Sequence, residues 1–139
     1  MTNPTLSSTR IAALEADRLK LIVVPLGVQP DFPVADCHRF EGLFHFTSAA
    51  TGFLKLSVSS PYTIGQTIPT PHGNLIVTDV QVKRVQDVTE LESRAAGFKH
   101  DRYWRASTDF VADFKTQHGL NAWDRNVWCA FVSVRKEGE

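Results

Sequence analysis

The sequence predicts a mixed α/β (α+β) domain in which a small β-sheet or barrel is flanked by about three helices. Three observations support this fold class. Short alternating or β-branched segments outnumber the helical ones, two helix-like segments end at glycines, and the last segment is apolar on both faces, as in a central strand covered twice. The chain has 139 residues, the usual size of one domain, so we expect residues 1–139 to form a single unit.

The composition is that of a globular protein without a marked net charge. Hydrophobic residues make up 42% of the chain and charged residues 22%. Lys plus Arg and Asp plus Glu number 15 each, which argues against a protein held to nucleic acid by bulk charge alone but leaves room for a local basic patch. No apolar run reaches the ~18 residues of a membrane span, and the start lacks the blocks of a secretion signal. We therefore expect a soluble cytoplasmic protein with no membrane partner.

The cysteines and histidines give no sign of a metal site or a cofactor. Cys37 and Cys129 lie far apart and form no CxxC motif, so we expect both to be reduced and at least partly buried. The five histidines show no HxH, HxxxH or HxxE spacing. The sequence predicts neither a metal ion nor another cofactor.

Six segments have the pattern of strands. They are Leu19–Val24, Leu43–Thr47, Phe53–Ser59, a segment that begins at Gln66, Asn74–Val85 and Val127–Val134. The second and third are close enough to form a hairpin. Two prolines interrupt the segment after Gln66, so this strand is expected to be short or to lie at an edge.

Three segments are typical of helices. The first covers Ser8–Arg18. The second begins near Asp87, where Glu90 would complete a pair resembling a capping box, and ends at Gly97, which suits a left-handed terminal residue. The third covers Ser107–His118, with Ser107 as its cap.

Taken in order, several segments resemble phage-type ASCH domain proteins, which belong to the PUA-like β-barrel superfamily. The opening from Ser8 to Pro30 is similar to their short helix, strand and Pro-rich loop, and PYTIGQ at 61–66 is similar to their PYxxGD turn. Residues 79–97 resemble a strand and helix that end in an EGF-like turn. The segment at 108–134, TDFVADFKTQHGLNAWDRNVWCAFVSV, resembles the closing helix and the WDxNPWVWVxxF strand, and it is the most specific part. The resemblance implies a small PUA-like barrel with flanking helices.

The resemblance also implies where catalytic groups would lie. Some small bacterial ASCH proteins are amidohydrolases that remove an acyl group from acetylated cytidine, with a Lys, a Thr and a Glu in the proposed chemistry. The matching positions here are Leu19, Ile22 and Ala96. None of these side chains can act as a nucleophile or take up a proton, so the comparison favours a protein that is not an enzyme.

Two nearby residues could replace the missing groups. Lys20 would need a one-residue slip or bulge, because neighbouring residues of a strand point to opposite faces. Glu92 lies four residues before Ala96 on the same side of the expected helix, although a solvated helix carboxylate is the simpler interpretation. These two residues are the only catalytic candidates.

Cations alternate with aromatic residues in KHDRYWR at 99–105. Single-stranded nucleic acid is bound by cations that contact phosphates and by rings that stack on bases. On the residues alone, packing of Tyr103 and Trp104 against the barrel, with the cations in solvent, is favoured over this interpretation. The candidate nucleic-acid-binding residues are Arg18, Lys20, Lys99, Arg102, Tyr103, Trp104 and Arg105.

Three functions remain open on these observations. The first is a non-catalytic module of ASCH type, of phage derivation, that binds single-stranded RNA or a nucleotide. The second is a divergent amidohydrolase or ribonuclease that acts on modified cytidine or RNA through Lys20 and Glu92. The third is a phage protein-interaction module that binds a host protein.

Overall fold

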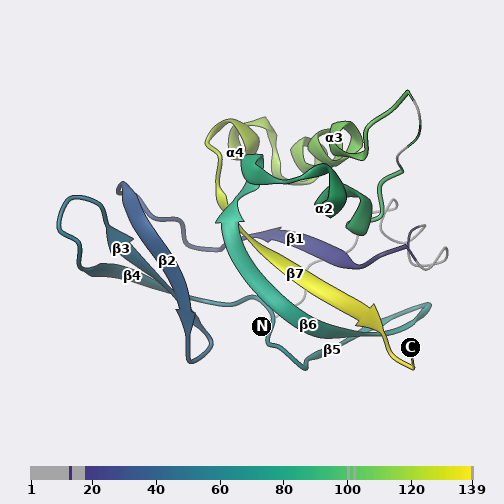
Figure 1. Cartoon of the computed structure of the whole chain (residues 1–139), viewed down its shortest axis with the longest axis horizontal. Coiled ribbons are helices and arrows are strands. Elements are labelled where there is room, and N and C mark those ends of the chain that lie inside the picture. The colour runs from purple at the N-terminus through teal and green to yellow at the C-terminus, as the bar shows by residue number, and fades with distance from the viewer. Residues whose placement is uncertain (1–12, 14–17, 100, 102, 139) are drawn as a thin grey trace.

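A computed structural model describes residues 13, 18–99, 101 and 103–138, and within them it contains seven strands and three α-helices. A four-stranded antiparallel sheet in the order β1-β7-β6-β5 lies between a three-stranded antiparallel sheet, β2-β3-β4, and the helices (Figure 1). The strands are β1 (Leu21–Pro25), β2 (Val34–Phe40), β3 (Leu43–Ser48), β4 (Leu54–Ser59), β5 (Thr67–Thr70), β6 (Gly73–Arg84) and β7 (Trp128–Lys136). The α-helices are α2 (Glu90–Ala95), α3 (Ala106–His118) and α4 (Leu120–Asp124), and η1 (Val85–Asp87) is a short 3₁₀ turn. The predicted α+β class, with sheets flanked by helices, is confirmed.

β7 is the central strand and is covered on both faces. It pairs with β1 on one side and with β6 on the other. Ala130, Val132 and Val134 face the core between the two sheets. Cys129 and Phe131 alternate with them and face the core under the helices. The prediction of a doubly covered central strand is therefore confirmed.

The predicted hairpin and the predicted edge strand are also confirmed. β3 pairs with β4, and the rings of Phe44 and Phe46 on one face of β3 are buried. β5 is four residues long and lies at the edge of its sheet. In contrast, β2 was not predicted, and it lies at an edge of the three-stranded sheet.

The helix boundaries depart from the prediction at their starts. Asp87 does not begin α2. The N-cap of α2 is Thr89. Its hydroxyl accepts from the Glu92 N–H, and the Glu92 carboxylate accepts from the Thr89 N–H, which makes a complete capping box. Ser107 does not cap α3 either, because α3 begins one residue earlier and its N-cap, Arg105, makes no side-chain cap.

The ends of the helices agree better with the sequence. Gly97 follows α2 with a φ of 97°, the positive φ expected of it, and α3 ends at Gly119 as predicted. α4 was not predicted. The helix expected over Ser8–Arg18 lies outside the described residues, apart from Ala13 and Arg18. None of the helices among the described residues is long and apolar enough to cross a membrane.

Candidate nucleic-acid interface

A hollow of about 450 Å³ lies where the end of α2 meets the segment before β1. We call it the basic hollow. It is lined by Arg18, Arg94, Phe98, Lys99 and Asp101. The structure thus brings together two of the predicted nucleic-acid-binding cations that are far apart in sequence, Arg18 and Lys99. Arg94 was not among the predicted residues.

Close contact between backbone segments sets the position of the basic hollow. Gly97 has a positive φ, and a Cβ at this position would lie 2.3 Å from the Cβ of Ala13. The Lys20 N–H donates to the Ala95 carbonyl at 2.6 Å, which ties the start of β1 to the end of α2. Phe98 is buried and meets the Phe110 ring edge-on, with centroids 6.0 Å apart. These contacts hold Arg18 beside the residues that follow α2.

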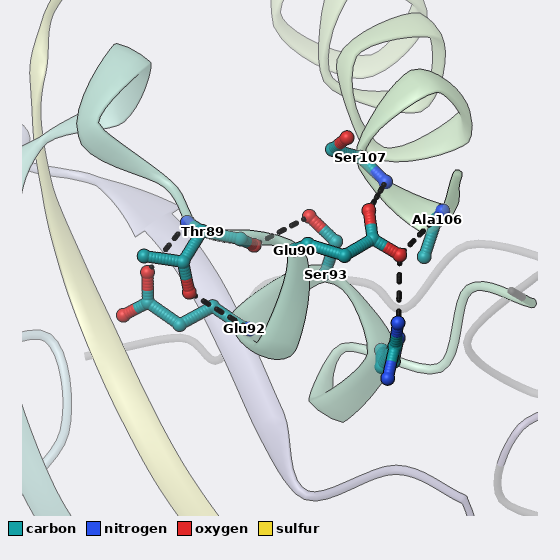
Figure 2. Close-up of polar contacts among 7 residues, drawn as sticks. Thr89, Glu90, Glu92, Ser93, Ala106 and Ser107 are labelled. Carbon is teal, nitrogen blue, oxygen red and sulfur yellow. Dashed lines mark hydrogen bonds and ion pairs between the residues drawn. The ribbon is translucent and has the colours of Figure 1, made fainter.

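Glu90 connects α2 to the start of α3. Figure 2 shows its carboxylate turned toward the start of α3, where it accepts from the backbone N–H groups of Ala106 and Ser107 at 3.0 and 2.9 Å. The Arg94 Nε, one turn along α2, donates to the same carboxylate at 3.2 Å. These hydrogen bonds, chiefly the one from the Ser107 backbone, lower the pKa of Glu90 to about 2. Glu90 therefore caps α3 from another helix and also fixes Arg94.

The spacing of Glu90 and Arg94 is a signal that sequence reasoning missed. Residues four apart lie on the same side of a helix, and a Glu that precedes an Arg at this spacing is a favourable pair. The pair could have been predicted from the sequence once the helix was placed. The position of this pair beside Arg18 could not have been predicted, because it depends on how the segment before β1 packs against α2.

The aromatic segment, residues 101 and 103–105, lies next to the basic hollow. Tyr103 is 84% exposed and Trp104 is 50% exposed, so the expectation that these rings pack against the barrel is wrong for Tyr103 and holds at most in part for Trp104. The connection between α2 and α3 runs out from the helices on the side away from the three-stranded sheet (Figure 1). Its rings are accessible to a ligand.

Asp101 links the basic hollow to the aromatic segment. Asp101 lines the hollow, and its carboxylate accepts from the Tyr103 N–H at 2.8 Å, while its own N–H donates to the Trp104 carbonyl at 3.0 Å. This local turn sets the two rings beside the cations. Arg105 is exposed at the end of the segment, and Arg102 lies outside the described residues.

The catalytic candidates occupy different surroundings. Glu92 accepts from the Lys83 ammonium at 2.6 Å as well as from the Thr89 N–H. The Lys20 side chain is exposed. The Lys20 N–H donates a hydrogen bond to the Ala95 carbonyl, and the Lys20 carbonyl accepts one from the Val134 N–H. The backbone of Lys20 is therefore held between α2 and β7, next to the start of β1.

The positions that correspond to catalytic residues in the resembled family are buried hydrocarbon. Leu19 and Ile22 belong to the core between the sheets, and Ala96 belongs to the core under the helices. Their exposed fractions are 3%, 3% and 0%. None of the three lines the basic hollow.

A second, polar cleft of about 380 Å³ opens between β2 and β6, and it was also missed. Arg39 crosses it and donates to the Val80 carbonyl at 3.1 Å, with Asp79 4.0 Å away.

Cys37 lies at the wall of this cleft, and burial together with the charge of Asp36 raises the pKa of its thiol to about 11. Cys129 is buried in the other core, where burial raises the pKa of its thiol to about 12. Both thiols are therefore protonated at neutral pH.

Comparisons with protein-family models, with curated proteins and with solved structures find no match to this chain.

Proposed function

We propose that this protein binds single-stranded RNA or a nucleotide without chemical change, on the surface formed by the basic hollow and the aromatic segment. The observation that carries the proposal is the exposure of Tyr103 and Trp104 beside a cluster of cations. Large exposed rings cost solvation free energy unless a partner covers them, and a nucleobase covers a ring by stacking. The cations supply contacts to the phosphates.

The zero net charge of the chain is compatible with this function, because the charge is unevenly distributed. Arg18, Arg94 and Lys99 line one hollow, and Arg105 follows within the adjacent segment. A few converging cations suffice for a short strand, although they predict weaker and less salt-sensitive binding than that of a strongly basic domain.

The absence of catalysis in the proposal rests on the surroundings of the candidate groups. The Glu92 carboxylate is already bonded to Lys83 and to the α2 cap. A general acid or base needs a proton to exchange with substrate, and a carboxylate held in this way serves the helix instead. The hydrocarbon at Leu19, Ile22 and Ala96 supplies no replacement.

We propose further that the fold is a PUA-like barrel of ASCH type. Two antiparallel sheets with flanking helices, and a central closing strand that begins at Trp128, agree with this proposal. The sites that carry chemistry in the resembled family would then have become part of the core, while the ligand surface lies on the connection between α2 and α3.

Binding of a labelled ten-nucleotide oligouridine, measured by fluorescence anisotropy, tests the function. We expect Tyr103→Ala to weaken binding by about tenfold or more, since stacking on one ring contributes about 1–3 kcal/mol per base. Lys99→Gln should lower the slope of log affinity against log salt by about 0.7, as expected for one lost phosphate contact on a single strand.

Matched controls come from β4 and the turn before it, and the three-stranded sheet to which β4 belongs lies far from the connection between α2 and α3 (Figure 1). Phe53→Ala removes a ring that is 76% exposed, and Lys55→Gln removes an exposed cation. Both should bind like the unchanged protein. Equal losses in the control and test variants, or no binding by the unchanged protein, would contradict the proposal.

A further inference from the structure

The basic hollow offers more cationic side chains than an internal phosphate of a strand requires. Arg18, Arg94 and Lys99 line it together with Asp101, and the Glu90 carboxylate, which contacts Arg94, offsets part of their charge. A phosphodiester within a strand has two unesterified oxygens. A terminal phosphate monoester has three strong acceptor oxygens, which matches the three cations more closely.

Arg94 is positioned before any ligand arrives. Its contact with Glu90 uses Nε, and among the described residues its two terminal nitrogens have no hydrogen-bond acceptor. Because Glu90 is itself fixed by the backbone of α3, the guanidinium is held with its outer edge available. A guanidinium that is already ordered loses little side-chain entropy when it binds a phosphate.

Arg18 supplies a second, independent indication of an anion. Its Nε is buried and has no hydrogen-bond partner within the part of the chain that the structure describes. A charged group removed from water without a partner is costly, and an anion against the outer nitrogens of the same delocalised guanidinium would offset that cost. Arg18 lines the hollow in which such an anion would lie.

The size of the hollow is compatible with a nucleotide end. Its volume of about 450 Å³ is near the lower part of the range of small-ligand pockets. Asp101 holds the turn with the aromatic rings next to it, so a phosphate in the hollow places the adjoining base near Tyr103 or Trp104. A strand that continues beyond this base would leave along the exposed segment.

We infer that the basic hollow holds the terminal phosphate monoester of a single strand, so that the protein binds phosphorylated ends in preference to hydroxyl ends. The inference rests on the proposed function, because it assigns to that surface the end of the strand it holds. Arg18, Arg94 and Lys99 contact the phosphate, and the aromatic segment holds the terminal base. Either a 5′- or a 3′-phosphate has the three acceptor oxygens.

Competition experiments with the full chain distinguish the ends. A labelled decauridine probe is displaced by unlabelled decauridines that carry a 5′-phosphate, a 3′-phosphate or hydroxyls at both ends. We expect one phosphorylated competitor to act at least tenfold more strongly than the hydroxyl form. Lys99→Gln and Arg18→Gln should reduce this ratio toward one, whereas Tyr103→Ala should weaken all three competitors by a similar factor.

The outcomes separate the two proposals. Equal competition by all three strands, with binding that still depends on Tyr103, overturns the terminal-phosphate inference and leaves the proposed function in place. A preference that survives unchanged in Lys99→Gln and Arg18→Gln also overturns it, because the phosphate then binds elsewhere. Absence of binding by every strand overturns both proposals. Lys99 is exposed, so Lys99→Gln keeps the test valid if Arg18→Gln lowers stability.

Discussion

At the scale of single residues, Gly97 is the position at which a larger side chain would most disturb the basic hollow. Its φ of +97° is accessible to glycine at little cost, and its missing side chain leaves space for Ala13. Any larger residue would separate the segment before β1 from the end of α2. The basic hollow therefore depends on a residue that contacts no ligand.

Gly97→Ala should lower the free energy of unfolding by about 2–5 kcal/mol, because the positive φ costs about 1–2 kcal/mol and the clash with Ala13 adds an overpacking cost. Gly52→Ala is the matched control, since Gly52 has a φ of +74° and no atom of the described residues lies within 4 Å of where its Cβ would be. It should show the cost of φ alone. Urea unfolding curves give both values, and equal losses would show that the contact with Ala13 contributes nothing.

At the scale of elements, Glu90 connects α2 to α3 through hydrogen bonds that need its charge. The pKa of Glu90 is lowered to about 2, so the charged form is favoured in the folded protein. A carboxyl whose pKa is lower when folded stabilises the protein above its unfolded value of about 4.5, and this stabilisation is lost as the pH falls toward 2.

Glu90→Gln should therefore melt several degrees below the unchanged protein at pH 7, and the difference should shrink as the pH falls from 4.5 to 2. Thermal melting followed by circular dichroism across this range measures it. Glu41→Gln, in the exposed turn between β2 and β3, should show no such difference at any pH. A gap that stays constant down to pH 2 would mean that the charge of Glu90 does not stabilise the helix junction.

Elements with a clear pattern could be predicted from the sequence, and those without one could not. The alternation in β3 and the two apolar faces of β7 follow from burial, which the sequence records directly. β2 contains Asp36, His38 and Arg39 and is mostly exposed, so no apolar period marks it. Asp87 and Thr89 are both suitable caps, and only the reach of Glu92 back to Thr89 decides between them.

Only part of the candidate site could be predicted from the sequence, because some of its residues are neighbours in the chain and others meet only through folding. The aromatic and basic residues of the segment after α2 are visible in the sequence, since they are neighbours in the chain. Arg94 and the approach of Arg18 are not, because they depend on tertiary packing against Gly97 and Ala13. The ring of Tyr103 was predicted to pack against the barrel, and this was wrong. A large ring is more often buried, and the local sequence does not show which residues lie opposite it.

At the scale of the whole molecule, β7 belongs to two cores at once. One core lies between the sheets and includes Phe46, and the other lies under the helices and includes Phe110. Because alternate residues of the same strand fill both cores, loss of one core removes the packing on one face of β7. We therefore expect the two cores to unfold together, as one cooperative unit.

Phe46→Ala and Phe110→Ala test this coupling, since each ring is almost fully buried in only one of the two cores. Each change should cost about 3–5 kcal/mol and shift the whole urea transition. Tryptophan fluorescence and far-ultraviolet circular dichroism should give coincident curves in both variants, because Trp128 packs against one core and Trp123 against the other. If Phe46→Ala moved the fluorescence transition while much of the helical signal persisted, the sheets and the helices would be separate units, and the ligand surface beside α2 would then depend on only one of them.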